Sequence, residues 1–271
     1  MMKKKIVVKL GGASLQNENT MTQLTSLLQG LRKNYNVVLV HGGGPAINEE
    51  LTKRGITWKF INGLRQTTPE MMAVIDEVLA QKVNSEIVTQ LNKAEVEALG
   101  LSGAKDQILF CVPSDAELMQ VGSVEKVNTE SIENVLAAEK IPVVAPIGYG
   151  SQSEKYNINA DWAAAKIAME LKADALIFLT DQDGILDADK KLIRQTTPLE
   201  ISQLIDGGVI SGGMMTKVRT MISALENDVK QVRVINANKA SQLLLEGCLG
   251  TVLLTENNLS NKDVSQWNHL T

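Results

Sequence analysis

Three glycine-rich segments of the chain carry residues suited to holding an anion. They are residues 9–12 (KLGG), residues 41–44 (HGGG), and residues 211–213 (SGG) followed by Lys217. Glycine amides carry no side chain that would block an anionic group, and lysines supply positive charge. Two lysines and several bare amides therefore suit a reaction in which negative charge on a phosphate or carboxylate must be stabilised.

The two lysines stand at positions where a lysine is unfavourable without a partner. Lys9 interrupts an apolar run that we interpret as a strand, and a lysine inside a central strand is costly unless its charge is compensated. It is either an edge-strand side chain that reaches solvent or a fixed charge at the carboxyl end of a sheet, and we favour the second. Lys217 lies near an expected helix start, where the helix dipole favours anions, so a bound anion would explain it.

Other polar clusters have both a structural and a functional interpretation. Residues 62–65 (NGLR) offer Arg65, a solvated surface charge or an anion ligand. Residues 157–161 (NINAD) place two amides and a carboxylate at a helix start, which fits capping or a site. The acidic turn at 181–184 (DQDG) resembles a calcium loop, but its glycine comes too early and no closing Glu follows, so we interpret it as a strand-to-loop turn.

Two familiar kinds of site are excluded by what the motifs lack. The HGGG segment could be the oxyanion loop of an esterase, but the chain has no Gly-x-Ser-x-Gly elbow, and its only other histidine is His269. We therefore interpret His41 as structural. The chain also lacks the P-loop and the dinucleotide-binding fingerprint, so any nucleotide site must have another design.

The elements that must position these residues alternate along the chain. Segments with helical periodicity separate short apolar runs, a pattern that predicts an α/β fold with a mostly parallel sheet and helices on both faces. Helix starts are marked by Thr68-Pro69, by Asn159 and by a capping box at 197–200, and the first of these helices should run to about residue 92. Residues 112–127 read as a hairpin or an irregular excursion. The expected strands are 6–10, 37–40, 108–112, 142–147, 175–180, 232–235 and 251–254.

Composition restricts the class of protein. The chain has 271 residues and a formal net charge of −4, which argues against a nucleic-acid partner. No apolar run approaches the roughly 20 residues of a membrane span, and the basic and then apolar amino end is too short for a signal peptide, so we expect a cytoplasmic protein. Cys111 and Cys248 lie in apolar runs and are expected to be reduced core residues.

Taken together, the six segments resemble the motifs of the amino acid kinase family, in order and in spacing. The resemblance covers the chain from Lys9 to at least Lys217 and implies a single three-layer αβα domain over residues 1–271, built on a mostly parallel central sheet of about eight strands. It implies a lobe for substrate and dimerisation at about 1–172 and an ATP lobe at about 173–271. ATP and Mg²⁺ are the implied cofactors, with the metal held mainly by the nucleotide phosphates and no metal site in the protein itself.

The resemblance also implies roles for individual residues. Lys9 and Lys217 would neutralise the transferred phosphoryl group, Asp161 would orient them, and Gly12 and Gly44 would donate backbone amides. Gly43, Gly44, Arg65 and Asn157 would hold the acceptor, with Arg65 on its α-carboxylate. The nucleotide would lie over a set of residues from two loops: Asp181, Gln182, Asp183, Gly184, Ile185, Leu186, Val209, Ile210 and Ser211.

Within the family, the chain is most similar to members that phosphorylate the side-chain carboxylate of N-acetyl-L-glutamate in arginine synthesis. The alternatives are N-acetyl-L-2-aminoadipate, one methylene longer, or a non-catalytic binding protein on the same fold. The resemblance further implies a homodimer that arginine does not inhibit, because the first strand begins at about Lys5 and leaves no room for an additional amino-terminal helix. A fused synthase activity is not expected at this length.

Overall fold

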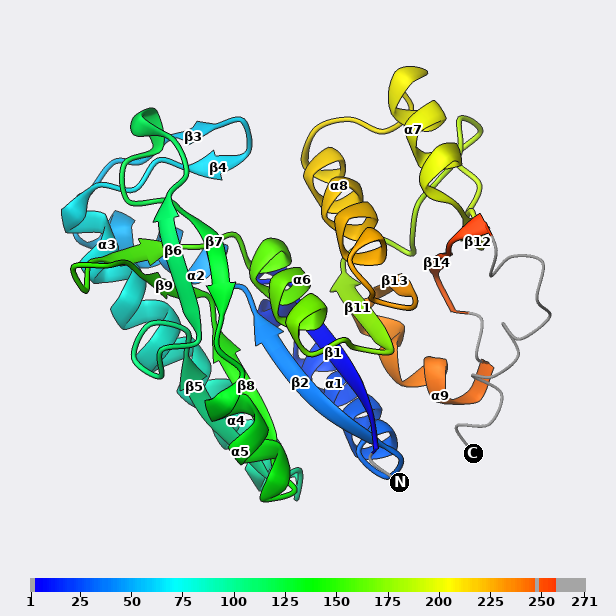
Figure 1. Ribbon diagram of the computed structural model, residues 1–271, viewed down its shortest axis with the longest axis horizontal. Helices are drawn as coiled ribbons and strands as arrows, with labels where there is room; N and C mark the ends of the chain where they lie inside the picture. Colours follow the sequence, from blue (N-terminus) through cyan, green and yellow to red (C-terminus); the bar gives the residue numbers. More distant parts are fainter. Residues whose placement is uncertain (1–2, 247–248, 257–271) are drawn as a thin grey trace.

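The computed structural model describes residues 3–246 and 249–256 of the chain. Its centre is an eight-stranded sheet in the order β12-β14-β13-β11-β1-β2-β8-β5 (Figure 1). Every neighbouring pair is parallel except β13 and β14, so the predicted mostly parallel sheet of about eight strands is confirmed. The strands are β1 (Lys4–Leu10), β2 (Tyr35–His41), β5 (Ala98–Ser102), β8 (Ile141–Ala145), β11 (Ala175–Thr180), β12 (Gln195–Thr196), β13 (Val232–Asn236) and β14 (Thr251–Leu253).

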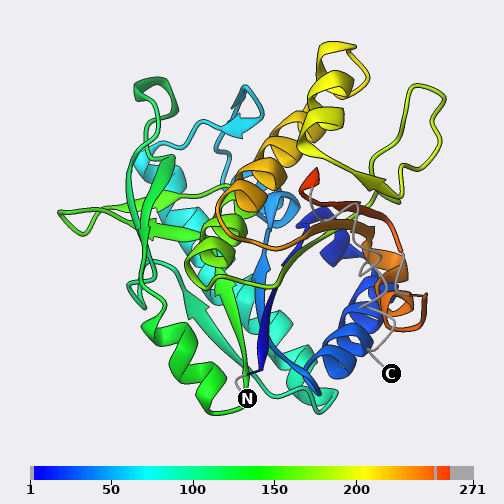
Figure 2. The ribbon, with the colours of Figure 1, turned by 45° about the vertical axis from the view of Figure 1, so that its right-hand side comes forward.

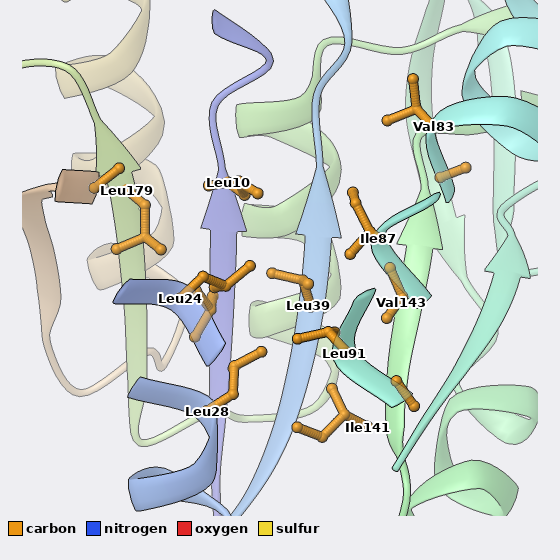
Figure 3. Close-up of a cluster of buried hydrophobic side chains, with 14 of the residues drawn as sticks. Leu10, Leu24, Leu28, Leu39, Val83, Ile87, Leu91, Ile141, Val143 and Leu179 are labelled. Atoms are coloured by element: carbon orange, nitrogen blue, oxygen red, sulfur yellow. The ribbon is translucent and has the colours of Figure 1, made fainter. Parts of the chain in front are cut away.

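Helices cover both faces of this sheet, and each face has its own hydrophobic core. Figure 2 shows α1 and α8 on opposite sides of the sheet, and Figure 3 shows Leu24 and Leu28 of α1 in one buried cluster with Leu10 of β1 and Leu39 of β2. The first core includes α1 (Glu18–Leu31), α3 (Pro69–Asp76) and α4 (Asn84–Lys93), and the second includes α5 (Glu130–Ala137), α6 (Ala160–Glu170) and α8 (Gly213–Glu226). The remaining α-helices of the described residues are α2 (Gly44–Lys53), α7 (Pro198–Asp206) and α9 (Leu243–Glu246).

Strand alternation decides which face receives Lys9. Ile6, Val8 and Leu10 point into the core beneath α1, whereas Val7 points into the core beneath α6 and α8. Because successive side chains of a strand point to opposite faces, Lys9 lies on the same face as Val7. The lysine at the carboxyl end of β1 is therefore directed towards α6 and α8, and it belongs to a central strand and not to an edge.

The predicted strand at 108–112 was placed in the wrong sheet. It forms β6 (Leu109–Pro113), which pairs antiparallel with β7 (Gly122–Val127) in a separate four-stranded sheet that also holds β9 (Ile147–Tyr149) and β10 (Lys155–Asn157). Of the two interpretations of 112–127, a hairpin or an irregular excursion, the structure shows the hairpin, and its first strand begins earlier, at Leu109. The place in the main sheet belongs to β5, whose sequence ALGLS gave no strand signal because a glycine interrupts it.

Helix starts followed the capping signals. Thr68 caps α3 with Pro69 at its first position, Thr197 and Glu200 form a capping box on α7, and Asn159 accepts hydrogen bonds from two amides at the start of α6. The long helix predicted from Thr68 does reach Lys93, but its middle, Glu77–Val83, is a π-helix. π-Helical turns inside α-helices are frequent near functional sites.

Two further expectations can be compared with the structure only in part. Cys111 is a free, buried cysteine, and burial raises the pKa of its thiol to about 12, as expected for a reduced core residue. Cys248 and His269 lie outside the described residues. Among the helices of residues 3–246 and 249–256, none is long and apolar enough to cross a bilayer.

Candidate active site

A buried ion cluster lies where β1 meets α6 and α8. Asp161, the second residue of α6, places Oδ1 2.7 Å from Lys9 Nζ and Oδ2 2.8 Å from Lys217 Nζ. The second contact is an aligned hydrogen bond, and the first is an ion pair. The Lys217 ammonium also lies 5.2 Å from the centre of the Phe178 ring on β11. Two cations share one carboxylate, so the cluster carries one positive charge in excess.

The electrostatics of the cluster combine burial and charge pairing. Burial would raise the pKa of Asp161, but the charges and hydrogen bonds of Lys9 and Lys217 outweigh it and lower this pKa to about 2. Burial lowers the pKa of Lys217 despite its contact with Asp161. The lowered pKa of Asp161 means that the fold stabilises its charged form, whereas the lowered pKa of Lys217 means that the fold disfavours its charged form. The charge count explains the difference, because two cations fully compensate the carboxylate but one carboxylate cannot fully compensate two cations.

Small residues allow these elements to approach closely. Ala163, Ala164, Ala165 and Ala168 of α6 are fully buried, so this helix packs tightly on the sheet. Figure 1 shows α6 and α8 side by side over β1 and β11. The alanine-rich sequence thus brings the Asp161 carboxylate within contact distance of a strand residue and of a residue from a second helix.

The two glycine loops interlock beside the cluster. Gly42 donates its amide to the Leu10 carbonyl at 2.8 Å, and a β-carbon on Gly12 would lie only 2.6 Å from the Gly43 nitrogen. Within the described residues, the amides of Gly12, Gly43 and Gly44 donate no hydrogen bond. Gly44 opens α2, so the positive end of a helix dipole lies at the same place. The loops can therefore bind an anion with their backbones.

His41 supports the second loop and does not line the pocket. Its side chain is fully buried, and Asn84 donates to Nε2 at 3.1 Å, so Nδ1 carries the proton and donates to the Gly42 carbonyl at 2.9 Å. Burial lowers the pKa of His41 to about 4, with the bond to Gly42 acting in the opposite direction. The ring is neutral at pH 7, which agrees with its interpretation as structural.

Arg65 is held at the far end of the site with its charge uncompensated. It ends β4 (Leu64–Arg65), which pairs with β3 (Phe60–Ile61), and its guanidinium lies 4.8 Å from the Phe60 ring centre and 5.7 Å from that of Trp58. Nη2 donates to Asn48 Oδ1 at 2.5 Å, whereas the buried Nη1 has no partner among the described residues. Burial lowers the pKa of Arg65, but an arginine remains charged. An anion would satisfy it.

A pocket of about 220 Å³ joins these groups. The catalytic and substrate-binding residues predicted from the sequence line it, with Lys217 as the one exception. Lys217 lines a second pocket of about 430 Å³, and the Lys9–Asp161–Lys217 cluster stands between the two. Lining the first pocket are Lys9, Gly12, Gly43, Gly44, Arg65, Asn157 and Asp161.

Nearly all the residues predicted to bind nucleotide line the second pocket. It lies between the loop after β11 and the segment before α8. Asp183 is the exception, because its carboxylate accepts from Lys239 Nζ at 2.8 Å and from Asn236 Nδ2 at 2.9 Å, outside the lining. The predicted residues that do line it are Asp181, Gln182, Gly184, Ile185, Leu186, Val209, Ile210 and Ser211.

Comparison with known proteins identifies this architecture. The model of the amino acid kinase family matches residues 4–236. The chain belongs to the amino acid kinase family. A protein named acetylglutamate kinase from Clostridioides difficile (strain 630) is 39% identical, with 94% of this chain and 92% of the relative aligned. Another of that name from Geobacter metallireducens is 40% identical, over 90% of this chain and 88% of the relative.

Solved structures agree with this amino acid kinase fold. A crystal structure from Streptococcus mutans UA159 superposes with a TM-score of 0.80 at 30% identity, over 94% of this chain and 100% of that one. Carbamate kinase from Giardia lamblia, solved with AMP-PNP, superposes with a TM-score of 0.71 at 18% identity, over 94% of this chain and 99% of that one. At that identity the second likeness concerns the fold alone.

Several residues that shape the site of this amino acid kinase were missed in the sequence. Asn48, Trp58 and Phe60 hold Arg65, and Asn84 orients His41. One signal was available, because Asn62-Gly63 is a dipeptide typical of tight hairpins. Both residues have positive φ, 50° and 82°. That hairpin sets Phe60 opposite Arg65.

Proposed function

We propose that this amino acid kinase uses ATP to phosphorylate the side-chain carboxylate of N-acetyl-L-glutamate, forming N-acetyl-L-glutamyl 5-phosphate for arginine synthesis. The observation that carries the proposal is the cluster of Lys9, Asp161 and Lys217, which stands between two pockets with one positive charge in excess. Relatives named acetylglutamate kinase, 39–40% identical over about nine-tenths of both chains, support the choice of substrate.

The reaction needs charge stabilisation and alignment more than proton transfer. An oxygen of the substrate carboxylate forms a bond to the γ-phosphorus while the bond from that phosphorus to the β,γ-bridging oxygen breaks, leaving an acyl phosphate and ADP. A carboxylate is already ionised near pH 7, so no general base is required. Negative charge spreads over the transferred group, and positioned cations and amides are the usual means of stabilising it.

The chain's residues divide this work between them. Lys9 and Lys217 face the transferred phosphoryl group from two sides, and Asp161 keeps both ammonium groups in place. The amides of Gly12 and Gly44 donate to the phosphoryl oxygens, because they have no other acceptor in the described residues. Holding the reactants in this geometry supplies much of the acceleration in such reactions.

The acceptor would occupy the pocket between the glycine loops and Arg65. The α-carboxylate of N-acetyl-L-glutamate would accept from the guanidinium of Arg65, whose Nη1 has no partner among the described residues. Asn157, whose amide group donates to Thr67 at 3.1 Å, would bind the acetylated nitrogen end, and Gly43 and Gly44 would bind by their backbones. A guanidinium suits this role because it can bind a carboxylate through two parallel hydrogen bonds.

ATP would lie in the second pocket, with its phosphates towards Lys217. In residues 3–246 and 249–256 no three His, Cys, Asp or Glu side chains gather to hold a metal ion. As the resemblance implies, the accompanying Mg²⁺ would be held mainly by the nucleotide phosphates, whose charge it neutralises. Asp183, although predicted to contact the nucleotide, pairs with Lys239 and Asn236, so we expect it to act only by shaping the loop.

A hydroxylamine trap tests the proposed reaction. Purified protein with ATP, Mg²⁺ and N-acetyl-L-glutamate should produce a hydroxamate. Lys217→Met should slow its formation about 10²- to 10³-fold, whereas Lys126→Gln on the exposed hairpin should not. The assay is repeated with N-acetyl-L-2-aminoadipate, because one methylene changes discrimination by only about 1–3 kcal/mol. A higher kcat/KM for this longer acid would show that it is the substrate in place of N-acetyl-L-glutamate. No acyl phosphate from either acid at millimolar concentration would indicate a binding protein.

A homodimer and a cytoplasmic location stay predictions. The structure offers one feature in support of self-association, the edge strand β5, which has no neighbour on its outer side in the described chain and whose Leu99 side chain is 46% exposed. Unpaired edge strands with apolar side chains tend to associate. Light scattering should give twice the chain mass, and Leu99→Lys should lower it. A monomer at micromolar concentration would contradict this prediction.

A further inference from the structure

A third cavity lies beside the substrate pocket and shares lining residues with it. It has a volume of about 390 Å³ and lies between the β6–β7 hairpin, α6 and the carboxyl-terminal part of α8, from which Ser223 lines it. Figure 1 shows these three elements in a row, with α6 between the hairpin and α8. Leu64, Val121, Ile158 and Asn159 line both this cavity and the substrate pocket. Cavities of this volume are typical of small-molecule sites.

The polar groups of this cavity lack partners. Trp162 and Lys166 stand four residues apart on α6, so they share one helix face. Both are half-buried, and within the described residues neither the indole nitrogen nor the ammonium makes a hydrogen bond or an ion pair. The half-buried Ser223 and the exposed Ser114 and Ser123 also line the cavity, and their hydroxyls make no hydrogen bond within the described residues. An indole N–H and an ammonium on one helix face therefore border a space in which neither has a partner.

The charge of the lining selects the kind of ligand. Lys166 is the only charged residue among those that line the cavity, and no aspartate or glutamate is among them. An anion would gain a charge-assisted hydrogen bond there, whereas a cation would be repelled. Leu64, Val121, Val124 and the Trp162 ring supply an apolar wall. The complementary molecule is a small organic carboxylate with an apolar body.

We propose that the cavity between α6, α8 and the β6–β7 hairpin binds a small apolar carboxylate, with Lys166 as the ligand of its carboxylate group. The site is separate from the reaction centre, because it contains none of the groups that bind the phosphoryl group or the acceptor's α-carboxylate. It lies between α6 and α8, which the expected division at about residue 172 assigns to different lobes. The inference does not depend on which acid the enzyme phosphorylates.

Isothermal titration with a matched series of probes tests the proposal. The series is 3-phenylpropanoate, its neutral amide 3-phenylpropanamide, and the cationic 3-phenylpropylamine. The carboxylate should bind once per chain with a millimolar or lower Kd and quench the fluorescence of Trp162. The amide should bind about tenfold more weakly, as the loss of one charge-assisted hydrogen bond implies, and the amine should not bind. Equal affinity for all three probes would overturn the proposal.

Four variants locate the binding site and separate it from the substrate pocket. Lys166→Gln should weaken carboxylate binding about tenfold and leave the amide unchanged. Ser223→Phe, which fills the cavity from α8, should abolish the binding of both, with circular dichroism confirming that the variant is folded. Lys126→Gln on the hairpin surface and Arg65→Gln in the substrate pocket should leave the affinity for the three probes unchanged, because neither residue lines the cavity. Binding that is lost in Arg65→Gln, or kept in Lys166→Gln and Ser223→Phe, refutes the assignment.

Discussion

Replacing Asp161 by asparagine removes, at nearly constant volume, the carboxylate that Lys9 and Lys217 share. The pKa of Asp161 lies at about 2, against the ordinary value of 3.8 for an aspartate. That difference of about two units is worth roughly 2.5 kcal/mol of stability at neutral pH. The variant also leaves two ammonium groups close together with side-chain exposures of only 10% and 12%. Breaking a buried ion pair costs about 3–5 kcal/mol.

We expect Asp161→Asn to lower the free energy of unfolding at pH 7 by about 3 kcal/mol, towards the lower end of that range. The lower end applies because both lysines border pockets that admit water. Urea denaturation followed by circular dichroism measures the change. Glu133→Gln is the matched control, because it makes the same substitution in the exposed pair with Lys5 and should cost no more than about 1 kcal/mol.

The effect of Asp161→Asn should depend on pH with a defined sign. The carboxylate's pKa is lower in the folded chain, so its stabilisation is complete above about pH 4 and is lost as the pH falls towards 2. The difference between wild type and variant should therefore narrow over that interval. A difference that stays constant from pH 7 to pH 3, or a variant as stable as the wild type at pH 7, would refute the electrostatic account of the cluster.

Four further variants test other parts of the site. Lys217→Met should lower kcat about 10²- to 10³-fold, because it removes a cation that stabilises the transferred group. It should change the free energy of unfolding by less than about 1 kcal/mol, because burial already lowers the pKa of this lysine and Lys9 remains to compensate the carboxylate. A matching loss of melting temperature would indicate a structural role. Gly12→Ala should destabilise the fold, since its β-carbon would lie 2.6 Å from a backbone nitrogen of the second loop, whereas Gly44→Ala, with nothing within 4 Å, should fold normally and lose activity. The wild type should lose about 3 kcal/mol of stability as the pH falls from 6.5 to 4, because the pKa of the buried His41 ring is lowered to about 4 and only the unfolded chain takes up the proton there. His41→Gln should remove this loss. An unchanged dependence of the free energy of unfolding on pH in the variant would contradict the prediction.

The sequence predicted the parts of the fold that depend on local chemistry. The starts of α3, α6 and α7 followed capping residues, and the central strands followed apolar runs. It did not predict which apolar run joins which sheet. Residues 109–113 look like a buried strand, but whether a strand joins the main sheet depends on contacts distant in the sequence. The missed strand β5 gains its stability from pairing with β8 and not from its own propensity.

The candidate site was predictable to the extent that its residues carry charge or lack side chains. Lys9, Lys217 and the glycines stood out because each is unfavourable in its setting unless an anion binds. The residues that hold Arg65 did not, because a neutral amide and two aromatic rings have no unusual property in sequence. Their role follows from the β3–β4 turn, which determines what faces the guanidinium.

The position of Lys9 within β1 explains why the cluster can form only there. Val8 and Leu10 point into the core beneath α1, so a lysine at either position would be buried among apolar side chains with no carboxylate in reach. At residue 9 the side chain meets α6 and α8 instead, at the carboxyl end of the sheet. A second carboxylate there would make the cluster neutral and the fold more stable, but it would also repel the phosphoryl group. The excess positive charge thus destabilises the free protein slightly and becomes favourable when an anion binds.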